Sequence, residues 1–388
     1  MTNSAAFWVQ MVALPILVLN VTGDSAIQLG LVMAARTVPA LALGLFAGVA
    51  ADMWNRKAIL LVTRMVVTAN AIWFAVMVMA GWAELWHIYL FAITRGATMV
   101  FDQPARRAMI PSMVPVQVVT NAMALNSGSV QLMRVFAAAL SGLVIATAGV
   151  ESAFLLIAGL YIIGIPLLVM LRAPDHARKG YKGPVAMLWD VREGIAFAWH
   201  APAIRGSLTV AAVYFTFGAS FVQVFIPLMA RGPLELDDEG LGAMFAVLGL
   251  GGITSTLVIA YVNPSRRRGV ILLASLGTVG SLMALFSGAS YLSFSYAAFV
   301  VVFLVGMAQS AFIPLFTALL AEAAPEQMRG RIMALLAYDQ AMVTVGAAAA
   351  GISAALLGPR EAVLWFGGLS MGAAILITIV SPAVRRIS

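Results

Sequence analysis

The most constraining feature of this chain is a succession of long apolar runs. A membrane-spanning helix needs about 20 consecutive apolar residues. Only 10% of the 388 residues are charged, against roughly 25% in soluble domains. The sequence therefore predicts an all-α polytopic membrane protein with twelve transmembrane helices. They cover residues 5–21, 27–50, 58–80, 86–101, 122–146, 152–171, 208–229, 241–262, 270–290, 295–319, 332–357 and 362–380.

The distribution of Lys and Arg predicts how the chain is oriented in the membrane. With the start of the chain inside, 17 of the 23 Lys and Arg residues fall in cytoplasmic segments, and only Arg231 and Arg360 fall in outer loops. An excess of these residues in cytoplasmic loops is the general rule. We therefore expect both termini in the cytoplasm. The net charge of +7 is explained by this topology, without a nucleic-acid partner.

The two halves of the sequence resemble each other. A shift of 210 residues places "PARRAMIPSMVPVQVVTNAMAL" over "PLFTALLAEAAPEQMRGRIMAL", with seven identities in 22 positions. Duplicated halves around a midplane site are the architecture of many secondary transporters. We therefore predict two six-helix halves related by a pseudo-two-fold axis. The N-terminal half is 1–171, the linker 172–205, the C-terminal half 206–380 and the cytoplasmic tail 381–388; over 188–198 the linker forms either an amphipathic surface helix or a solvated connector.

The short polar loop "GVAADMWNRK" at residues 48–57 separates two of the apolar runs. Arg56 and Lys57 are the cations that hold a cytoplasmic loop in place. Gly48 permits close packing of helix backbones. Asp52 lies at the cytoplasmic rim, where a helix N-terminus or an arginine would stabilise its charge. A contact of Asp52 that forms in only one conformation would make it a switch.

Three segments carry a resemblance to a known family. "GVAADMWNRK" resembles the Gly-x-x-x-Asp-Arg-x-x-Arg-Arg/Lys signature between spans 2 and 3 of the major facilitator superfamily. "FDQPARRAMIPSMVP" with "NAMALNS", and "PEQMRGRIMAL" in the second half, are similar to the twelve-span branch that contains macrolide and enterobactin exporters. The resemblance covers nearly the whole chain and implies small-molecule transport by alternating access. It also implies that Asp52 helps to hold the outward-facing state, with Arg56 and Lys57 as its cytoplasmic cations.

The chain departs from the family pattern at several points. Met53 stands where the family usually has Arg, and Asn263 lies near the expected acid of the second-half copy "YVNPSRRRG". After Arg134 the sequence reads "VFAAALSG", without the Gly-Pro pair of proton-coupled exporters, which weighs against an antiporter. Relatives carry a short basic lead before the first span, so a start upstream of Met1 stays open.

Four arginines fall inside the predicted spans. Each costs at least ~2.5 kcal/mol at a helix centre. Arg64 lies about 9 Å from the inner end of its span at helical rise, and we expect it to reach the membrane edge. Arg36, Arg95 and Arg134 lie deeper, where such residues face a cavity, pair with an acid or contact substrate. Arg95 resembles the membrane arginine that the superfamily links to proton movement.

A polar face on the fifth run predicts part of a substrate cavity. Ser127, Gln131 and Arg134 recur at i, i+4 and i+7, which places them on one side of a helix; a polar contact between helices is the alternative. The excess of deep cations predicts a cavity that favours anionic, carboxylate- or catecholate-bearing compounds. The further candidates for this cavity are Arg36, Tyr214, Gln223, Gln309 and Tyr338.

The one deep acid is Asp339, about 10 Å from the cytoplasmic end of its span at helical rise. A carboxylate buried in the membrane can take up and release a proton during a transport cycle. Asp339 and Arg95 are therefore the candidate proton-coupling residues; a fixed ion pair between Asp339 and one arginine is the alternative. Asp102, at the inner end of the fourth run, is expected to pair with Arg106 or another loop cation.

These features favour a monomeric, proton-driven exporter of a small amphipathic compound in a bacterial cytoplasmic membrane. A facilitator or importer, or a membrane assembly factor on the same scaffold, stays open. An enzyme is disfavoured because the sequence has no intramembrane paired-acid constellation and no nucleotide-binding Gly-rich loop. We expect no cofactor and no metal, since the chain has no cysteine and its three histidines lack metal-ligand spacing.

Overall fold

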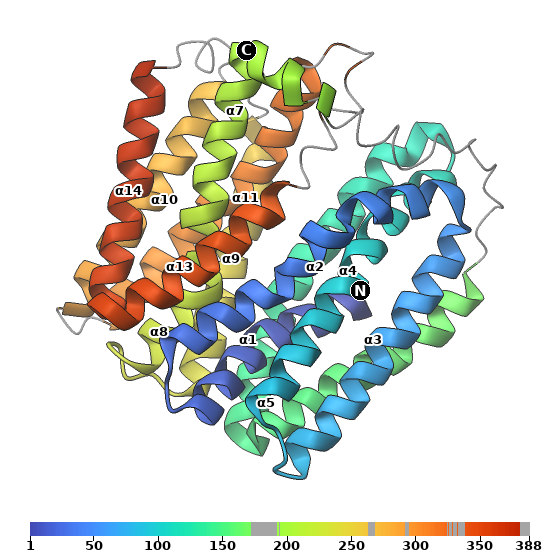
Figure 1. Ribbon diagram of the computed structural model, residues 1–388, viewed down its shortest axis with the longest axis vertical. Coiled ribbons are helices and arrows are strands. Elements are labelled where there is room, and N and C mark those ends of the chain that lie inside the picture. The colour runs from blue at the N-terminus through green and yellow to red at the C-terminus, as the bar shows by residue number, and fades with distance from the viewer. Residues whose placement is uncertain are drawn as a thin grey trace. The chain divides into compact units, whose positions relative to one another are not determined.

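The computed structural model describes residues 1–171, 192–193, 195–262, 268–291, 295–323, 325, 328, 332 and 338–380, and all the regular structure in these ranges is helical (Figure 1). The chain divides into two compact units. Unit 1 comprises Met1–Gly183 with Asp237–Ala246, and unit 2 comprises Pro184–Leu236 with Val247–Ser388. Within the predicted linker, residues 195–200 are helical, whereas most of the predicted surface helix before them lies outside the described residues.

Unit 1 is built around its first five helices. In this unit α1 packs on α5, α2 on α4, and α3 on both α4 and α5. Three buried aromatic rings join α3, α4 and α5. Phe74 of α3 stacks on Phe91 of α4 with ring centres 4.3 Å apart, and Phe154 of α5 meets Phe74 edge to face with ring centres 5.0 Å apart. The helices are α1 (Thr2–Thr22), α2 (Ala26–Met53), α3 (Arg56–Met79), α4 (Leu85–Ser112) and α5 (Val119–Met170), with the one-turn 3-10 helix Val116–Val118 before α5.

Local sequence explains where the first helices of unit 1 begin and end. Gly23 ends α1 in the left-handed conformation, with φ of 61°, which glycine adopts without strain. The Ser25 side chain accepts a hydrogen bond from the Gln28 amide and caps α2. The Asn55 side chain accepts one from the Ala58 amide, at 3.1 Å, and caps α3. Such caps satisfy amide groups that the helix leaves without an internal partner.

Helix α5 combines two of the predicted spans. Its 52 residues would extend roughly 78 Å at 1.5 Å per residue, far more than a bilayer core of about 30 Å. At Gly149 the backbone leaves the helical conformation, with φ of 81° and ψ of 165°. This conformation is essentially restricted to glycine. The break separates residues 119–148 from 150–170, each of a length that suits one crossing.

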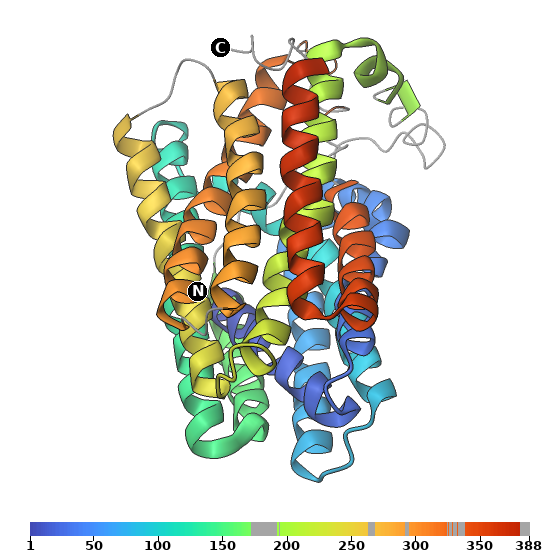
Figure 2. The ribbon, with the colours of Figure 1, turned by 90° about the vertical axis from the view of Figure 1, so that its left-hand side faces the viewer.

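Unit 2 contains a second group of packed helices. Helix α10 packs on α11 and α14, and α13 packs on α14 (Figures 1 and 2). Gly280 and Gly367 bring α10 and α14 into backbone contact, because a Cβ at either position would meet the carbonyl oxygen of the other. The helices are α7 (Pro202–Val213), the π-helical stretches η2 (Tyr214–Gly218) and η3 (Phe221–Phe225), α8 (Ile226–Arg231), α10 (Arg268–Tyr291), α11 (Ser295–Ala323), α13 (Tyr338–Leu357) and α14 (Pro359–Val380). Helix α9 (Asp238–Val262) begins in unit 1 and continues in unit 2 from Val247.

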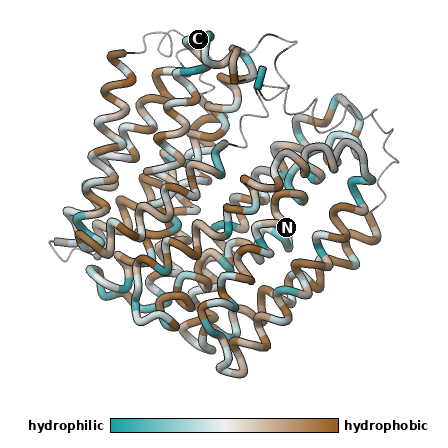
Figure 3. The backbone as a smooth tube through the Cα atoms, in the orientation of Figure 1, coloured by the Kyte–Doolittle hydropathy of each residue, from teal (hydrophilic) through white to brown (hydrophobic). Residues whose placement is uncertain are grey.

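The helices are hydrophobic along much of their length (Figure 3). Many large apolar side chains are exposed, as expected where lipid rather than water is the solvent. Among the described residues, 10 segments have the length and hydropathy of a membrane span. Helix α5 is one of these segments, although it covers two predicted spans. Helix α4 is not among them, and it carries Arg95, Asp102, Arg106 and Arg107. The exact number of twelve and the symmetry of the two halves stay predictions.

Candidate functional site

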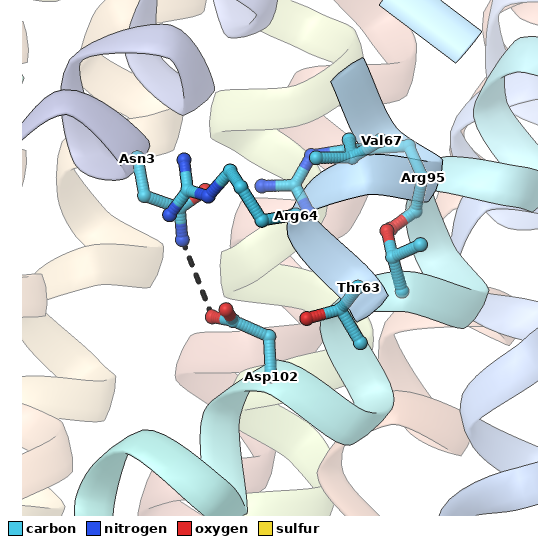
Figure 4. A pocket seen from close by; sticks show the side chains of 7 residues that line it. Asn3, Thr63, Arg64, Val67, Arg95 and Asp102 are labelled. Atoms are coloured by element: carbon cyan, nitrogen blue, oxygen red, sulfur yellow. Dashed lines mark hydrogen bonds between the residues drawn. The ribbon is translucent and has the colours of Figure 1, made fainter. Parts of the chain in front are cut away.

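A cluster of polar side chains lies inside unit 1, between α1, α3 and α4 (Figure 4). It surrounds a pocket of about 10 Å³, which is at the lower limit for holding one water molecule. Helix α3 contributes Arg64, α4 contributes Arg95 and Asp102, and α1 contributes Asn3. Arg95 is 5% exposed and Asp102 is 8% exposed, so charged groups are buried together here.

Asp102 is held by two neighbours in this cluster. Arg106 lies one helical turn away and forms an ion pair with it at 2.9 Å, which confirms the predicted pairing with a loop cation. The Asn3 amide donates a hydrogen bond to the same carboxylate oxygen at 3.2 Å (Figure 4). Arg106 of the same helix therefore offsets the negative charge of Asp102, and Asn3 of α1 donates a hydrogen bond to it.

The expectation that Arg64 reaches the membrane edge stays a prediction, and its side chain is half-buried. Its side chain points into unit 1 and lines the same pocket as Asp102 and Arg95 (Figure 4). Its guanidinium carbon lies 5.5 Å from the centre of the Tyr161 ring. The attraction of a buried carboxylate and an aromatic face accounts for the inward direction, which distance along the helix could not reveal.

Aromatic rings support the deep arginines, and the sequence interpretation missed them. The Phe7 ring lies 5.7 Å from the Arg36 guanidinium and 5.9 Å from that of Arg95. Tyr161 lies within 6 Å of both Arg64 and Arg95. Each such contact is worth about 0.5–2 kcal/mol. The aromatic pair Phe7 and Trp8 in an otherwise aliphatic first run was the available signal.

Arg36 is buried, as predicted, and lies at a close crossing of α2 and α4. Its guanidinium donates to the Met11 sulfur at 2.9 Å. Its backbone carbonyl would meet a Cβ placed on Gly96, so only glycine fits at that point of α4. The neighbouring Arg95 is thereby brought towards the same interior region as Arg36.

Arg134 is buried on α5, with its guanidinium 4.9 Å from the Trp8 ring centre. Ser127 and Gln131 lie on the same helix, but their side chains are outside the described set. The predicted polar face of this helix therefore stays a prediction at Ser127 and Gln131.

The two cations in the first turn of α3, Arg56 and Lys57, hold the ends of other helices in unit 1. Arg56 donates to the Ala108 carbonyl oxygen near the end of α4, at 2.8 Å. Lys57 donates to the Val169 carbonyl oxygen at the end of α5, also at 2.8 Å. Carbonyls at helix C-termini lack internal partners and attract cations. Gly48 and Asp52 lie in α2, and the side chain of Asp52 is not among those described.

In unit 2, Asp339 lines a cavity of about 370 Å³. This volume lies within the range of small-molecule sites. Asp339 is half-buried, in the first described turn of α13. The cavity wall is mainly apolar, and its other members include Trp199, Arg205, Phe215 and Phe316. The cavity thus combines a carboxylate, a guanidinium and aromatic rings.

The remaining candidates surround the π-helical stretches of unit 2. Tyr214 is buried and stacks on Phe312 at 3.7 Å. Gln309 is buried on α11 and donates to the Gly218 carbonyl oxygen at 3.1 Å. Gln223 is half-buried in η3, and the side chain of Tyr338 is outside the described residues. Tyr214 and Gln309 thus have packing partners inside the unit, and their predicted contact with substrate stays a prediction.

Long apolar helices with buried charged side chains define a polytopic membrane protein. In the described part of the chain, no group of three or more His, Asp or Glu side chains could hold a metal ion. The chain belongs to the Major Facilitator Superfamily, whose family model matches residues 1–338. It is accordingly a transporter and not an enzyme.

Curated relatives include exporters. The chain is 28% identical over 380 residues to the enterobactin exporter EntS of Salmonella typhi, covering 97% of this chain and 88% of that protein. It is 25% identical over 346 residues to the multidrug efflux pump Tap of Mycolicibacterium fortuitum, covering 87% and 82%. A staphyloferrin A transporter of Staphylococcus aureus is 24% identical over 264 residues, covering 66% and 63%.

Solved structures of transporters share the fold. A crystal structure of the peptide transporter POT matches with a TM-score of 0.80 at 12% identity, covering 100% of this chain and 94% of that one. A D-xylose-proton symporter matches with a TM-score of 0.75 at 12% identity, covering 99% and 98%. At these identities the likeness concerns the fold alone.

Proposed function

We propose that this protein exports a small amphipathic anion, siderophore-like or drug-like, from the bacterial cytoplasm by alternating access, driven by protons. The observation that carries the anionic specificity is the excess of buried positive charge in unit 1. Arg36, Arg95 and Arg134 are each less than 10% exposed. The buried carboxylate among them, Asp102, is already paired with Arg106. A cavity lined by these buried cations would favour an anionic substrate over a cationic one, because opposite charges attract strongly where water is excluded.

The direction of transport is supported by the relatives. One is named as an exporter of enterobactin, another as a multidrug efflux pump. Export is the printed activity of these relatives. For this chain it is a proposal, since the identities are 25–28%. A monomer in the cytoplasmic membrane, with both termini inside, fits the distribution of Lys and Arg.

We propose that Asp339 takes up and releases the coupled proton. Arg95, in the other half of the chain, is the second proposed proton-coupling residue. The position of Asp339 in the wall of a 370 Å³ cavity supports this role, because substrate and proton could then act on one space. The basic Arg205 in the same wall would favour an anionic headgroup, and the rings of Trp199 and Phe215 an apolar body. Protonation of Asp339 would remove the negative charge that opposes such an anion.

We propose that Gly48, Asp52, Arg56 and Lys57 form the conformational switch. In this switch the contacts of Arg56 and Lys57 stay the same during the movement. The contacts of the two cations lie within unit 1, so a movement of the unit as a body would leave them intact. The proposed halves are 1–171 and 206–380, joined by 172–205 and followed by the tail 381–388, with six spans in each half.

A facilitator or importer is the second candidate, and an assembly factor without transport activity the third. The experiment that separates them is flux in proteoliposomes with an imposed pH gradient, for anionic compounds and their cationic analogues. For wild type we expect gradient-dependent flux of the anions. For Asp339→Asn we expect this flux to fall by about tenfold or more, since the side chain can no longer be protonated and deprotonated.

Asp24→Asn is the matched control. Asp24 lies in the loop between α1 and α2 with φ of 61°, a conformation that asparagine tolerates, so flux should be unchanged. Flux that ignores both the gradient and Asp339→Asn would indicate a facilitator. Better transport of a cation than of its anionic analogue would overturn the proposed specificity, and no flux of any compound would favour an assembly factor.

A further inference from the structure

The 370 Å³ cavity of unit 2 opens between the helical segment 195–200 and α7. Among the described residues that line it, the exposed ones are Ile195 and Trp199 of that segment and Arg205 and Thr209 of α7. Ile195 is 42% exposed and Trp199 is 67% exposed. Residues that line a cavity and are also exposed mark its opening, so these four side chains form the mouth of the cavity.

The guanidinium group of Arg205 lies at this mouth. Its Nη1 donates to the Trp199 carbonyl oxygen at 3.4 Å, which holds the group beside another mouth residue. A guanidinium carries several N–H donors in a planar fork that matches the two oxygens of a carboxylate. One contact through Nη1 leaves the other donors of Arg205 available to an anion at the mouth.

The interior of the cavity is apolar. Phe215 of η2 and Phe316 of α11 line it and are 8% and 2% exposed, and Ala211 of α7 is 5% exposed. An alkyl or aryl group that contacts these side chains is removed from water, which favours binding. The volume lies near the lower limit of about 300–1,000 Å³ for small-molecule sites. The space therefore suits one apolar tail rather than two.

The sequence places the mouth at a membrane interface. Arg205 and Trp199 both precede the seventh predicted span, residues 208–229, on its predicted cytoplasmic side. Tryptophan is enriched at the level of the lipid headgroups. Phe215 lies inside that span, so the cavity changes from polar to apolar in the direction from the interface to the membrane interior. An amphiphile in the inner leaflet has the same order of groups.

We propose that this cavity binds the exported compound as a single-tailed monoanion, such as a medium-chain fatty acid, which enters from the inner leaflet. Its carboxylate binds the Arg205 guanidinium at the mouth, and its tail packs against Phe215 and Phe316. Asp339 lines the same cavity, and its carboxylate disfavours a second negative charge. This inference rests on the proposed export function in one respect, that the bound compound is the transported one.

Equilibrium binding of tritiated dodecanoate tests the proposal, with the full-length protein in nanodiscs, at one pH and without a gradient. Empty nanodiscs give the background from partition into lipid. We expect saturable binding to wild type. For Arg205→Gln we expect binding to weaken by about tenfold or more, because a charged hydrogen bond to the carboxylate is lost. Arg205→Lys keeps the positive charge and should weaken binding less than Arg205→Gln.

Unlabelled competitors test the chemical class of the ligand. Dodecanoate should displace the bound label from wild type. Butanoate lacks the tail, and dodecyltrimethylammonium carries the opposite charge, so neither should displace it at the same concentration. Displacement by butanoate would contradict the apolar interior as the site of the tail, and displacement by the cation would contradict the role of Arg205.

Arg192→Gln is the matched control. Arg192 is an exposed arginine that precedes the same helical segment and does not line the cavity, so its variant should bind dodecanoate as wild type does. Equal affinity of wild type and Arg205→Gln would overturn the proposal. An equal loss in Arg192→Gln and Arg205→Gln would indicate a general attraction to basic residues and would also overturn it.

Photo-crosslinking of wild type covers the case in which the Arg205 variants do not fold. Dodecanoate with a diazirine at the end of its tail should label the peptide that contains Phe215 or the one that contains Phe316. Labels found only on other peptides would contradict the site. Neither measurement depends on flux. Binding without any flux would refute the proposed export alone, and gradient-driven flux without this binding would refute the present inference alone.

Discussion

At Gly96 the backbone of α4 lies against that of α2, and this single residue positions two arginines. A Cβ there would meet the carbonyl group of Arg36 and approach the Pro39 ring at 3.3 Å. Because both neighbours belong to rigid parts of α2, they cannot move aside as a flexible side chain could. The approach of the helices thus depends on the absence of one methyl group beside Arg95.

We expect Gly96→Ala to destabilise the protein by about 1–3 kcal/mol, the usual range for overpacking a buried contact. The measurement is the melting temperature in detergent, with gradient-driven flux as a second readout. Gly159→Ala is the control, since a Cβ at Gly159 would have no atom within 4 Å and alanine is a better helix former. Equal melting temperatures of the two variants would contradict the close contact.

At this scale the sequence indicated which residues are buried but not what they contact. Arg36, Arg95 and Arg134 were predicted to lie deep, and they are buried. The inward direction of Arg64 depends on Tyr161 and Asp102, which lie far from it in sequence. The pairing of Asp102 with Arg106 was predictable, because residues four apart are neighbours on a helix.

The seventh predicted span consists of short helical pieces rather than of one regular helix. The chain from Pro202 to Arg231 passes from α-helix through two π-helical stretches and back. Such stretches are frequent at functional sites. Gln309 of α11 bonds to the Gly218 carbonyl at the end of the first stretch, and a Cβ on Gly346 of α13 would meet the Thr216 carbonyl. Two neighbouring helices thus contact the irregular backbone directly.

We expect Gln309→Met, which keeps the length of the side chain and removes its amide, to destabilise the protein by about 1–3 kcal/mol. That is the cost of leaving a buried acceptor without its donor. Thr254→Val on α9 is the control, because its hydroxyl is exposed and bonds only within its own helix. If thermal unfolding shows no greater loss for Gln309→Met than for Thr254→Val, the hydrogen bond is not important for stability.

Sequence reasoning located the spans but not their irregularities. The runs at residues 122–146 and 152–171 were predicted as separate helices, and the break at Gly149 falls between them. The π-helical stretches left no comparable signal, since "YFTFG" and "FVQVF" read as ordinary apolar helix. Their geometry depends on contacts with α11 and α13, which no local pattern encodes.

At the scale of the whole molecule, the absence of cysteine makes topology directly measurable. The chain has no cysteine, so any thiol label on the protein reports an introduced residue. Trp54 and Trp82 lie just beyond opposite ends of α3 and are 62% and 66% exposed. They therefore form a matched pair for the two sides of the membrane.

We expect Trp82→Cys to react with a membrane-impermeant maleimide in intact cells, and Trp54→Cys to react only after permeabilisation. This follows from the predicted placement of Arg56 and Lys57 on the cytoplasmic side. Wild type, without cysteine, serves as the unlabelled control. The opposite labelling pattern would invert the proposed orientation of the chain.

The family and the general architecture were predictable from the sequence, because span length and loop charge depend on the bilayer rather than on long-range contacts. The loop motif at residues 48–57 and the family match to residues 1–338 agree. The exact count of spans is harder, since α4 carries charges that lower its hydropathy while its partners bury them.

The anchors of Arg56 and Lys57 have a consequence for how this protein can vary in evolution. Both bind backbone carbonyl oxygens, at Ala108 and Val169. A carbonyl is present whatever side chain stands at those positions, so either residue can be replaced without loss of the bond. The two cations should therefore be retained among relatives while their partner positions drift. Correlated substitution between sequences would then give no sign that these helix ends are joined.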